Sequence, residues 1–219
     1  MPHRTRVEEA NPSASSKKLN SGFTLIEMLA VIALIGVLAA ILIPVIGTVR
    51  DRAQASGCQN NLRQIGIGLQ LYMQDNELRF PGPLYAIQPT FYKEGTTTSL
   101  LYHLVPYLDL PPVTSNKQYS ELFACPTYLA EKPIYEDPRS YMVPATRGTG
   151  YPFGYPGGGQ MPKTLYYIQD QHDLSDTWIL RDIGGSSRAN LMDENPHRDG
   201  NNCLYLDGSV RIVPFEETP

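Results

Sequence analysis

A long apolar run is the first pattern along the chain. Phe23–Ile46 spans 24 residues and contains one ionisable side chain, Glu27, near its polar end. As an α-helix it would be about 36 Å long, enough to cross a hydrocarbon core of about 30 Å with a slight tilt. A cleaved secretory signal has an apolar region of only about 7–15 residues. The run therefore predicts a membrane-spanning helix, with cleavage after the small residues Leu38–Ala40 as the alternative.

Beyond Ile46 the chain becomes polar but keeps a helical period to about Gln74. At 100° per residue one stripe about 80° wide holds the residues that should face a core, namely Cys58, Leu62, Ile65, Leu69 and Tyr72. Ile67 and Leu71 lie on another side, where either extra core contact or a subunit contact would explain them. A single helix from Phe23 to Gln74 would be about 78 Å long, a length that suits a filament.

The remainder of the chain reads as a loop-rich globular domain. Proline-rich connections occupy 80–90 and 109–116, and Ser99–Leu108 predicts a short helix broken at Pro106. Tyr135–Gln160 contains four prolines and six glycines, which predicts a long surface loop.

Strand patterns occur mainly near the C-terminus, at Leu165–Gln169, Thr177–Arg181, Asn202–Leu206 and Ser209–Val213. Asp207-Gly208 is the dipeptide that a two-residue type I′ hairpin prefers. Such a turn pairs Tyr205 with Val210 and Cys203 with Ile212 on one apolar face. The expected fold is α+β, with a long N-terminal helix packed on a small antiparallel sheet.

Charge and cysteine content exclude several function classes. The net charge is −4 with no basic block, which argues against nucleic acid as a partner. The three cysteines have no CxxC spacing and predict no metal cluster. Cys203, on the apolar hairpin face, is expected to be a core thiol. Cys58 and Cys125 either form a disulfide or stay as two buried free thiols, and we favour the free thiols.

The stretch KKLNSGFTLIEMLAVIALIGVLAAILIPVIG, residues 17–47, resembles the class III signal and N-terminal helix of type IV pilins and type II secretion pseudopilins. The resemblance implies that the α+β fold is a pilin-like lollipop. It also implies that a prepilin peptidase cuts between Gly22 and Phe23 and methylates the new amine. It divides the chain into a leader (1–22), a transmembrane helix (23–46), its amphipathic extension (47–76) and a globular head (77–219) with a hairpin at 202–213.

The same resemblance implies partners and a location. The partners are copies of the chain itself, the prepilin peptidase, and an inner-membrane assembly platform with its cytoplasmic ATPase. Lys17 and Lys18 before the apolar run place the N-terminus in the cytoplasm and the head in the periplasm, although Arg50 and Arg52 on the far side partly offset that bias.

Cleavage gives Glu27 a physical role. The new amine at Phe23 is largely protonated near neutral pH, and a neighbouring helix displaced along the axis would bring its own amine to this carboxylate. A buried charge is tolerated when it is paired, so Glu27 would set the register between subunits. The alternative is an incidental acid that reaches the headgroups. Gly36 and Pro44 mark a weak stretch where the helix bends, or a simple kink at the membrane exit.

A second resemblance lies at the C-terminus, where His197 is followed nine residues later by Asp207-Gly208. This matches the H-X9-DG module of prepilin-like proteins, in which a segment similar to Asn61–Asp75 and a dipeptide like Cys125-Pro126 also recur. The module carries no known activity. We expect His197 and Asp207 to support the hairpin rather than to catalyse a reaction.

No catalytic pattern is present, so no enzymatic activity and no cofactor are expected. His103, His172 and His197 lack metal-ligand spacing. Some pseudopilins hold calcium in C-terminal loops, which makes Asp170, Asp173 and Asp176 weak candidates, but a solvated loop with capping aspartates explains them more simply.

The sequence thus predicts a structural filament subunit. The alternative function is a membrane-anchored module that binds a ligand through the aromatic loop Tyr151–Gly159, and incorporation into filaments separates the two. The sequence does not distinguish a secretion pseudopilin from a pilus subunit, or a major from a minor subunit.

Overall fold

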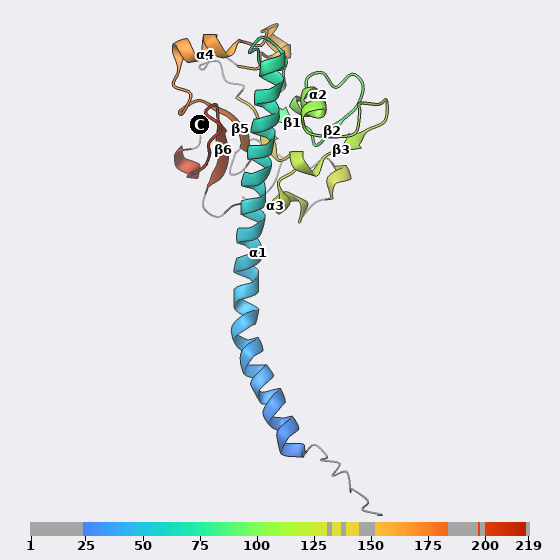
Figure 1. Ribbon diagram of the computed structural model, residues 1–219, viewed down its shortest axis with the longest axis vertical. Coiled ribbons are helices and arrows are strands. Elements are labelled where there is room, and N and C mark those ends of the chain that lie inside the picture. Colours follow the sequence, from blue (N-terminus) through green and yellow to red (C-terminus); the bar gives the residue numbers. More distant parts are fainter. Residues whose placement is uncertain are drawn as a thin grey trace, which may run out of the picture. The chain divides into compact units, whose positions relative to one another are not determined.

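The computed structural model describes residues 24–130, 133–136, 139–144, 152–183, 197 and 200–217. It divides into two compact units, Met1–Ile46 and Gly47–Pro219, and helix α1 (Leu25–Asp75) contributes to both. A long N-terminal helix combined with an antiparallel sheet confirms the predicted α+β class. Figure 1 shows the order of the elements along the chain.

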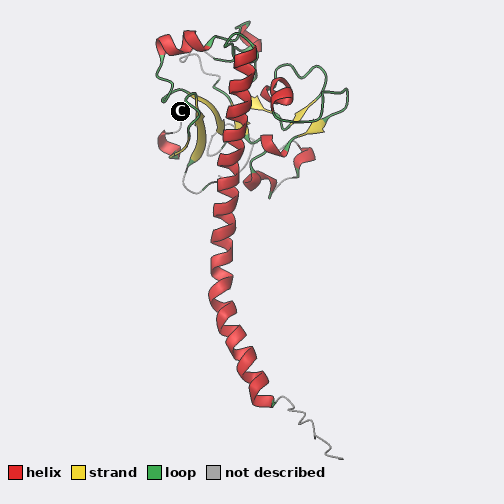
Figure 2. Ribbon diagram, viewed as in Figure 1, coloured by secondary structure: helices red, strands yellow, loops and turns green. Residues whose placement is uncertain are grey.

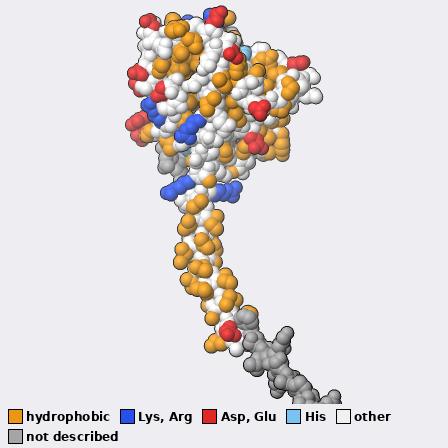
Figure 3. Space-filling view, in the orientation of Figure 1, with side chains coloured by type: hydrophobic (Ala, Val, Ile, Leu, Met, Phe, Trp, Pro, Cys, Tyr) orange, Lys and Arg blue, Asp and Glu red, His pale blue; other side chains and the backbone are white. Residues whose placement is uncertain are grey.

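The first unit consists, where it is described, of the N-terminal part of α1. Its large apolar side chains are exposed on every side of the helix, with exposed fractions between 47% at Val31 and 78% at Leu25. They form the orange surface of this segment in Figure 3. An 18-residue window reaches a mean hydropathy of 3.1 with none of it buried, so the helix is long and apolar enough to cross a membrane. α1 continues through Gly36 and Pro44, and the bend expected there stays a prediction.

Within its described residues, the second unit contains two antiparallel sheets (Figure 2). The larger has the strand order β1 (Ile87–Gln88), β4 (Tyr141–Met142), β5 (Trp178–Asp182), β6 (Asn201–Tyr205) and β7 (Val210–Val213). The smaller pairs β2 (Phe91–Tyr92) with β3 (Gln118–Tyr119). The described part of this unit also has the short α-helices α2 (Leu100–Leu104), α3 (Pro126–Leu129) and α4 (Leu165–Gln171). It has 3-10 turns at Val105–Tyr107, Glu121–Phe123, Ile134–Glu136, Pro156–Gly158 and Phe215–Glu217.

The second half of α1 packs on the core of this unit through the predicted stripe. Cys58, Leu62 and Ile65 are fully buried and Leu69 is 1% exposed, while Tyr72 is half-buried beside the buried Met73. The helix packs closely against β6 at Gly66, where an added Cβ would lie only 3.1 Å from the Leu204 side chain. In Figure 1, β5 and β6 lie on one side of this part of α1 and α2, β2 and β3 on the other.

The second apolar pair on α1 does not contribute to the core. Ile67 is 58% exposed and Leu71 is 42% exposed. The option that these two side chains extend the core is therefore wrong, and a contact with another subunit stays as the prediction.

The segment Leu165–Gln169, predicted as a strand, is helical and forms most of α4. The hydroxyl of Thr164 accepts a hydrogen bond from the backbone N–H of Tyr167, which caps the helix start. Ile168 is the buried residue of this short helix. The aromatic pair Tyr166-Tyr167 suggested strand propensity, but the cap and one buried contact decide the local structure.

The loop predicted at Tyr135–Gln160 is only partly a surface loop. Within its described residues, Tyr141 and Val143 are buried around β4, which lies between β1 and β5 in the sheet. Phe153 is also fully buried and meets Phe80 at 5.3 Å between ring centroids. By contrast, the helix predicted to break at Pro106 is confirmed, because α2 ends at Leu104 and a 3-10 turn follows.

The C-terminal hairpin is confirmed, but its predicted register is wrong by one residue. Leu204 pairs with Val210 and Cys203 with Arg211. The loop is longer than two residues, because Tyr205 donates its N–H to the carbonyl of Ser209, and Gly208 adopts φ +85°. A three-residue loop with a left-handed glycine is the next commonest hairpin. The shift places Leu204 in the core and leaves Ile212 47% exposed.

Candidate functional site

The start of α1 is closed by a reciprocal capping box. The Glu27 carboxylate accepts hydrogen bonds from the backbone N–H and the hydroxyl of Thr24, both at 2.8 Å, and the Glu27 N–H donates to the Thr24 hydroxyl at 3.3 Å. This T-x-x-E signature was readable in the sequence and was missed. Glu27 therefore has a structural role inside its own helix, and its role in subunit register stays a prediction. Gly22 and Phe23 lie outside the described residues.

A buried cluster forms where α1 meets the head. Cys58 on α1 and Cys125, directly before α3, form a disulfide with their Cα atoms 4.8 Å apart. The structure therefore has the Cys58–Cys125 disulfide, and the expectation of two free thiols is wrong. Asp182 at the end of β5 and His197 complete the cluster, and the exposed fractions of the four residues lie between 0% and 6%.

His197 contacts two members of the cluster through one ring nitrogen. Its Nε2 lies 2.9 Å from Oδ2 of Asp182 and 3.4 Å from Sγ of Cys125. Asn202 fixes the carboxylate by donating its backbone N–H and its side-chain amide to the two oxygens, each at 2.7 Å. His197 therefore belongs to a buried polar cluster that reaches the hairpin strand β6 through Asp182 and Asn202. Its expected role in supporting the hairpin stays a prediction.

The cluster does not have the arrangement of a Cys-His-Asp triad. In such a triad the base contacts the nucleophile through one ring nitrogen and the acid through the other. Here both contacts are made by Nε2, and Cys125 is fully buried and bonded to Cys58. The geometry places the possible ligand atoms of Cys58, Cys125 and His197 within 4.8 Å of one another, and Asp182 contacts the same nitrogen of His197.

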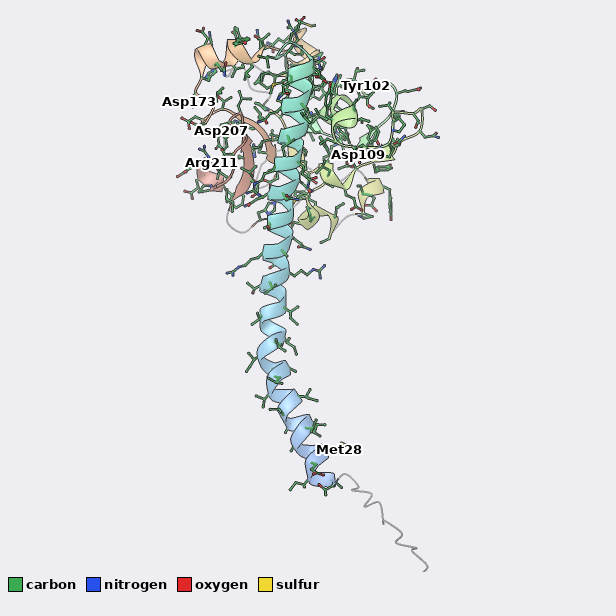
Figure 4. All side chains as sticks on the ribbon, in the orientation of Figure 1. Met28, Tyr102, Asp109, Asp173, Asp207 and Arg211 are labelled. Carbon is green, nitrogen blue, oxygen red and sulfur yellow. A yellow bond between two sulfur atoms is a disulfide. The ribbon has the colours of Figure 1, made fainter. Side chains whose placement is uncertain are left out.

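Asp207 supports the hairpin as predicted. Its carboxylate accepts the N–H of Ser209 at 2.8 Å and pairs with the Arg211 guanidinium at 3.3 Å. Asp207 and Arg211 are labelled in Figure 4. The hydrogen bond from Ser209 lowers the pKa of the Asp207 carboxyl. Arg211 also lies 4.6 Å from the centre of the Tyr205 ring.

The acidic segment considered for calcium contains a local turn. Asp173 accepts hydrogen bonds from the N–H and the hydroxyl of Ser175, both at 2.8 Å, which lowers the pKa of its carboxyl. Among the described residues, the side chains close enough together to share an ion are Cys58, Cys125 and His197. Calcium binding by Asp170, Asp173 and Asp176 stays a prediction.

The third cysteine is a core thiol, as predicted. Cys203 is fully buried in β6, and burial raises the pKa of its thiol to about 12. A thiol that stays protonated is a poor nucleophile and a poor metal ligand.

An exposed apolar helix with a capped start, continuous in sequence with an antiparallel α+β head, is the combination expected of pilin-type proteins. Residues 17–43 match the family of the prokaryotic N-terminal methylation motif. The chain is also similar to the type II secretion system core protein G of Pseudomonas aeruginosa, at 25% identity over 134 residues that cover 60% of this chain and 80% of that protein. No solved structure matches the chain. The motif and this relative support a pseudopilin or pilin type of filament subunit, and the H-X9-DG resemblance stays a prediction.

Proposed function

We propose that this chain is a structural subunit of a filament of the type II secretion or type IV pilus kind. The observation that carries the proposal is the apolar part of α1, which exposes its large side chains all round and lies within and just after the matched methylation motif. Such a surface requires an apolar environment on every side. A membrane supplies it before assembly, and the helices of other subunits supply it in a filament.

Two further features fit self-association. Ile67 and Leu71 extend exposed apolar surface onto the part of α1 that belongs to the second unit. Glu27 lies in the first turn of the helix, where the amine of a neighbouring mature subunit would neutralise it. Burial of a charge is favourable only with such a partner.

The proposal includes the route by which the subunit reaches the filament. A prepilin peptidase at the inner membrane cuts after Gly22 and methylates Phe23. A membrane platform with a cytoplasmic ATPase then extracts the subunit, whose head is on the periplasmic side. The matched motif at residues 17–43 and the similarity to core protein G support this route.

Processing is tested by mass spectrometry of the N-terminus after expression with a prepilin peptidase. The mature chain should begin at N-methylated Phe23, and Gly22→Val should leave the precursor at full length because the cleavage site is lost. The matched control is Gly36→Ala, at a glycine where a Cβ would meet no atom within 4 Å, which should be processed normally. A mature N-terminus near Ala40 would show an ordinary secretory signal and would refute the proposal.

Glu27 can be tested so that its charge and its cap are separated. Glu27→Gln keeps a side chain that can complete the capping box but removes the charge, whereas Thr24→Ala weakens the cap and keeps the charge. If charge pairing sets the register, Glu27→Gln should lower incorporation into sheared filaments at least about tenfold, and Thr24→Ala should leave most of it intact. Normal assembly of Glu27→Gln would show that the carboxylate serves only to cap its own helix.

The alternative of a ligand-binding module receives less support. The loop at 151–159 has buried residues in its described part, namely Pro152, Phe153 and Gly154. Of its described aromatic residues, Phe153 is buried in the core and Tyr155 is half-buried. We propose a structural role for the chain rather than a catalytic one.

A further inference from the structure

The cluster of Cys58, Cys125, His197 and Asp182 lies apart from the features that the filament role uses. It draws its members from α1, from the residue before α3, from β5 and from a residue just ahead of β6. Their donor types are two sulfurs, one imidazole nitrogen and one carboxylate oxygen. All four side chains are buried, so any ion held among them would be shielded from water.

We propose that these four side chains form a tetrahedral Zn²⁺ site in the reduced chain. The geometry points to it because Cys125 Sγ and Asp182 Oδ2 approach the same nitrogen of His197, at 3.4 Å and 2.9 Å. The ligand atoms of Cys58, Cys125 and His197 all lie within 4.8 Å of one another. Zinc–ligand bonds of about 2.0–2.3 Å place tetrahedral ligand atoms roughly 3.3–3.8 Å apart. The Cys125–His197 distance of 3.4 Å lies in this range, whereas Asp182 would have to move about 0.4 Å away from His197 to join the same ion.

Charge and orientation also suit a zinc ion. Two thiolates and one carboxylate carry three negative charges, and Zn²⁺ supplies two positive charges. The buried guanidinium of Arg181 also interacts electrostatically with Asp182. Asn202 holds both oxygens of Asp182, which is the kind of outer hydrogen bonding that orients a metal ligand. Soft sulfur with imidazole favours zinc over calcium or magnesium.

The disulfide and the zinc site exclude each other. A thiolate is the metal ligand, and the sulfurs of a disulfide have no such charge. The oxidised chain therefore holds its helix to the head through the Cys58–Cys125 bond, and the reduced chain would hold the same two segments through the metal. Each form fixes α1 to the segment before α3 at the same point.

The test uses the full chain in detergent micelles. One sample is kept oxidised, a second is reduced with a phosphine, and both are incubated with Zn²⁺, desalted and analysed for bound metal. The reduced chain should retain one zinc per chain and the oxidised chain none. Co²⁺ in place of Zn²⁺ should give the intense visible bands of a tetrahedral site and a thiolate-to-metal band in the near ultraviolet, a measurement that needs no variant.

Variants then assign the ligands. His197→Ala and Asp182→Asn should each weaken zinc binding by more than the roughly 10–100-fold typical of an outer-shell change. The matched controls are His172→Ala, an exposed histidine, and Cys203→Ala, a buried cysteine outside the cluster, and both should bind zinc as the unmodified chain does. A reduced chain that takes up no zinc, or zinc binding that persists in His197→Ala, would overturn the proposal.

Discussion

The two halves of α1 belong to one continuous helix, yet they differ in how their apolar side chains are exposed. In the first unit the helix exposes Leu25, Ile35 and Ile43 at 57% or more, and the described residues cover no side of it. In the second unit a single stripe from Cys58 to Met73 is buried, and Ile67 on another side is exposed. A uniform apolar surface therefore marks the half whose environment lies outside the chain, whereas a stripe marks the half that its own head covers.

The largest change in stability is expected from removing the Cys58–Cys125 disulfide, because this bond joins the covered half of α1 to the head. Replacing Cys58 and Cys125 together by serine opens a loop with a sequence separation of 67 residues. In the chain-entropy model this lowers the free energy of unfolding by about 4 kcal/mol. Fluorescence of Trp178, the single tryptophan, reports the unfolding of the second unit in urea.

Cys203→Ala is the matched control for that experiment, since it changes a buried cysteine that forms no disulfide. It should lower the free energy of unfolding by a much smaller amount. If the two substitutions have equal effects, the bond contributes nothing beyond the packing of its sulfurs.

The next contrast sets a covered residue of α1 against an exposed one. Leu62→Ala removes a fully buried side chain and should lower the free energy of unfolding by about 2–5 kcal/mol through the cavity it leaves. Ile67→Ala, five residues on, should change it by less than about 0.5 kcal/mol. Urea unfolding followed by Trp178 fluorescence measures both.

Ile67→Ala, which should hardly change the free energy of unfolding, is expected to have its effect on filament assembly instead. If Ile67 contacts another subunit, Ile67→Ala should lower incorporation into filaments while leaving the folded head intact. A variant that assembles normally would show that this exposed apolar side chain has no role in subunit contact.

The smallest effect is expected at the hairpin, far from the helix surfaces. The folded-state pKa of Asp207 is lowered, so its charge stabilises the fold above the unfolded pKa of about 3.9, and that contribution is lost as the pH falls through the folded value. Asp207→Asn keeps an acceptor for the Ser209 N–H. It should cost about 0.2–1 kcal/mol at pH 7 and nothing near pH 2, by urea unfolding at both pH values. An equal cost at both would assign the effect to the turn and not to the charge.

Elements with a strong period were predictable from the sequence, and those decided by few contacts were not. The buried stripe of α1 and the strands of the hairpin follow from hydrophobic spacing. The register failed because Asp207-Gly208 suits both two-residue and longer loops. β1 and β4 have two residues each, too few for any pattern to appear.

The candidate sites show the same division. The capping box at Thr24 and Glu27 is local and was readable from residue types three positions apart. The buried cluster joins Cys58, Cys125, Asp182 and His197, whose separations in sequence are far outside any metal-ligand motif. Only the folding of the sheet against α1 brings these side chains together.

The Cys58–Cys125 bond also determines how the chain would respond to tension. A pull applied at the N-terminal end of α1 and at the C-terminus passes directly from residue 58 to residue 125 through the two sulfurs, so the intervening segment bears no load. At about 3.3–3.6 Å per extended residue, a separation of 67 residues withholds about 220–240 Å of contour length. Under force the oxidised chain would extend by that much less than the reduced one.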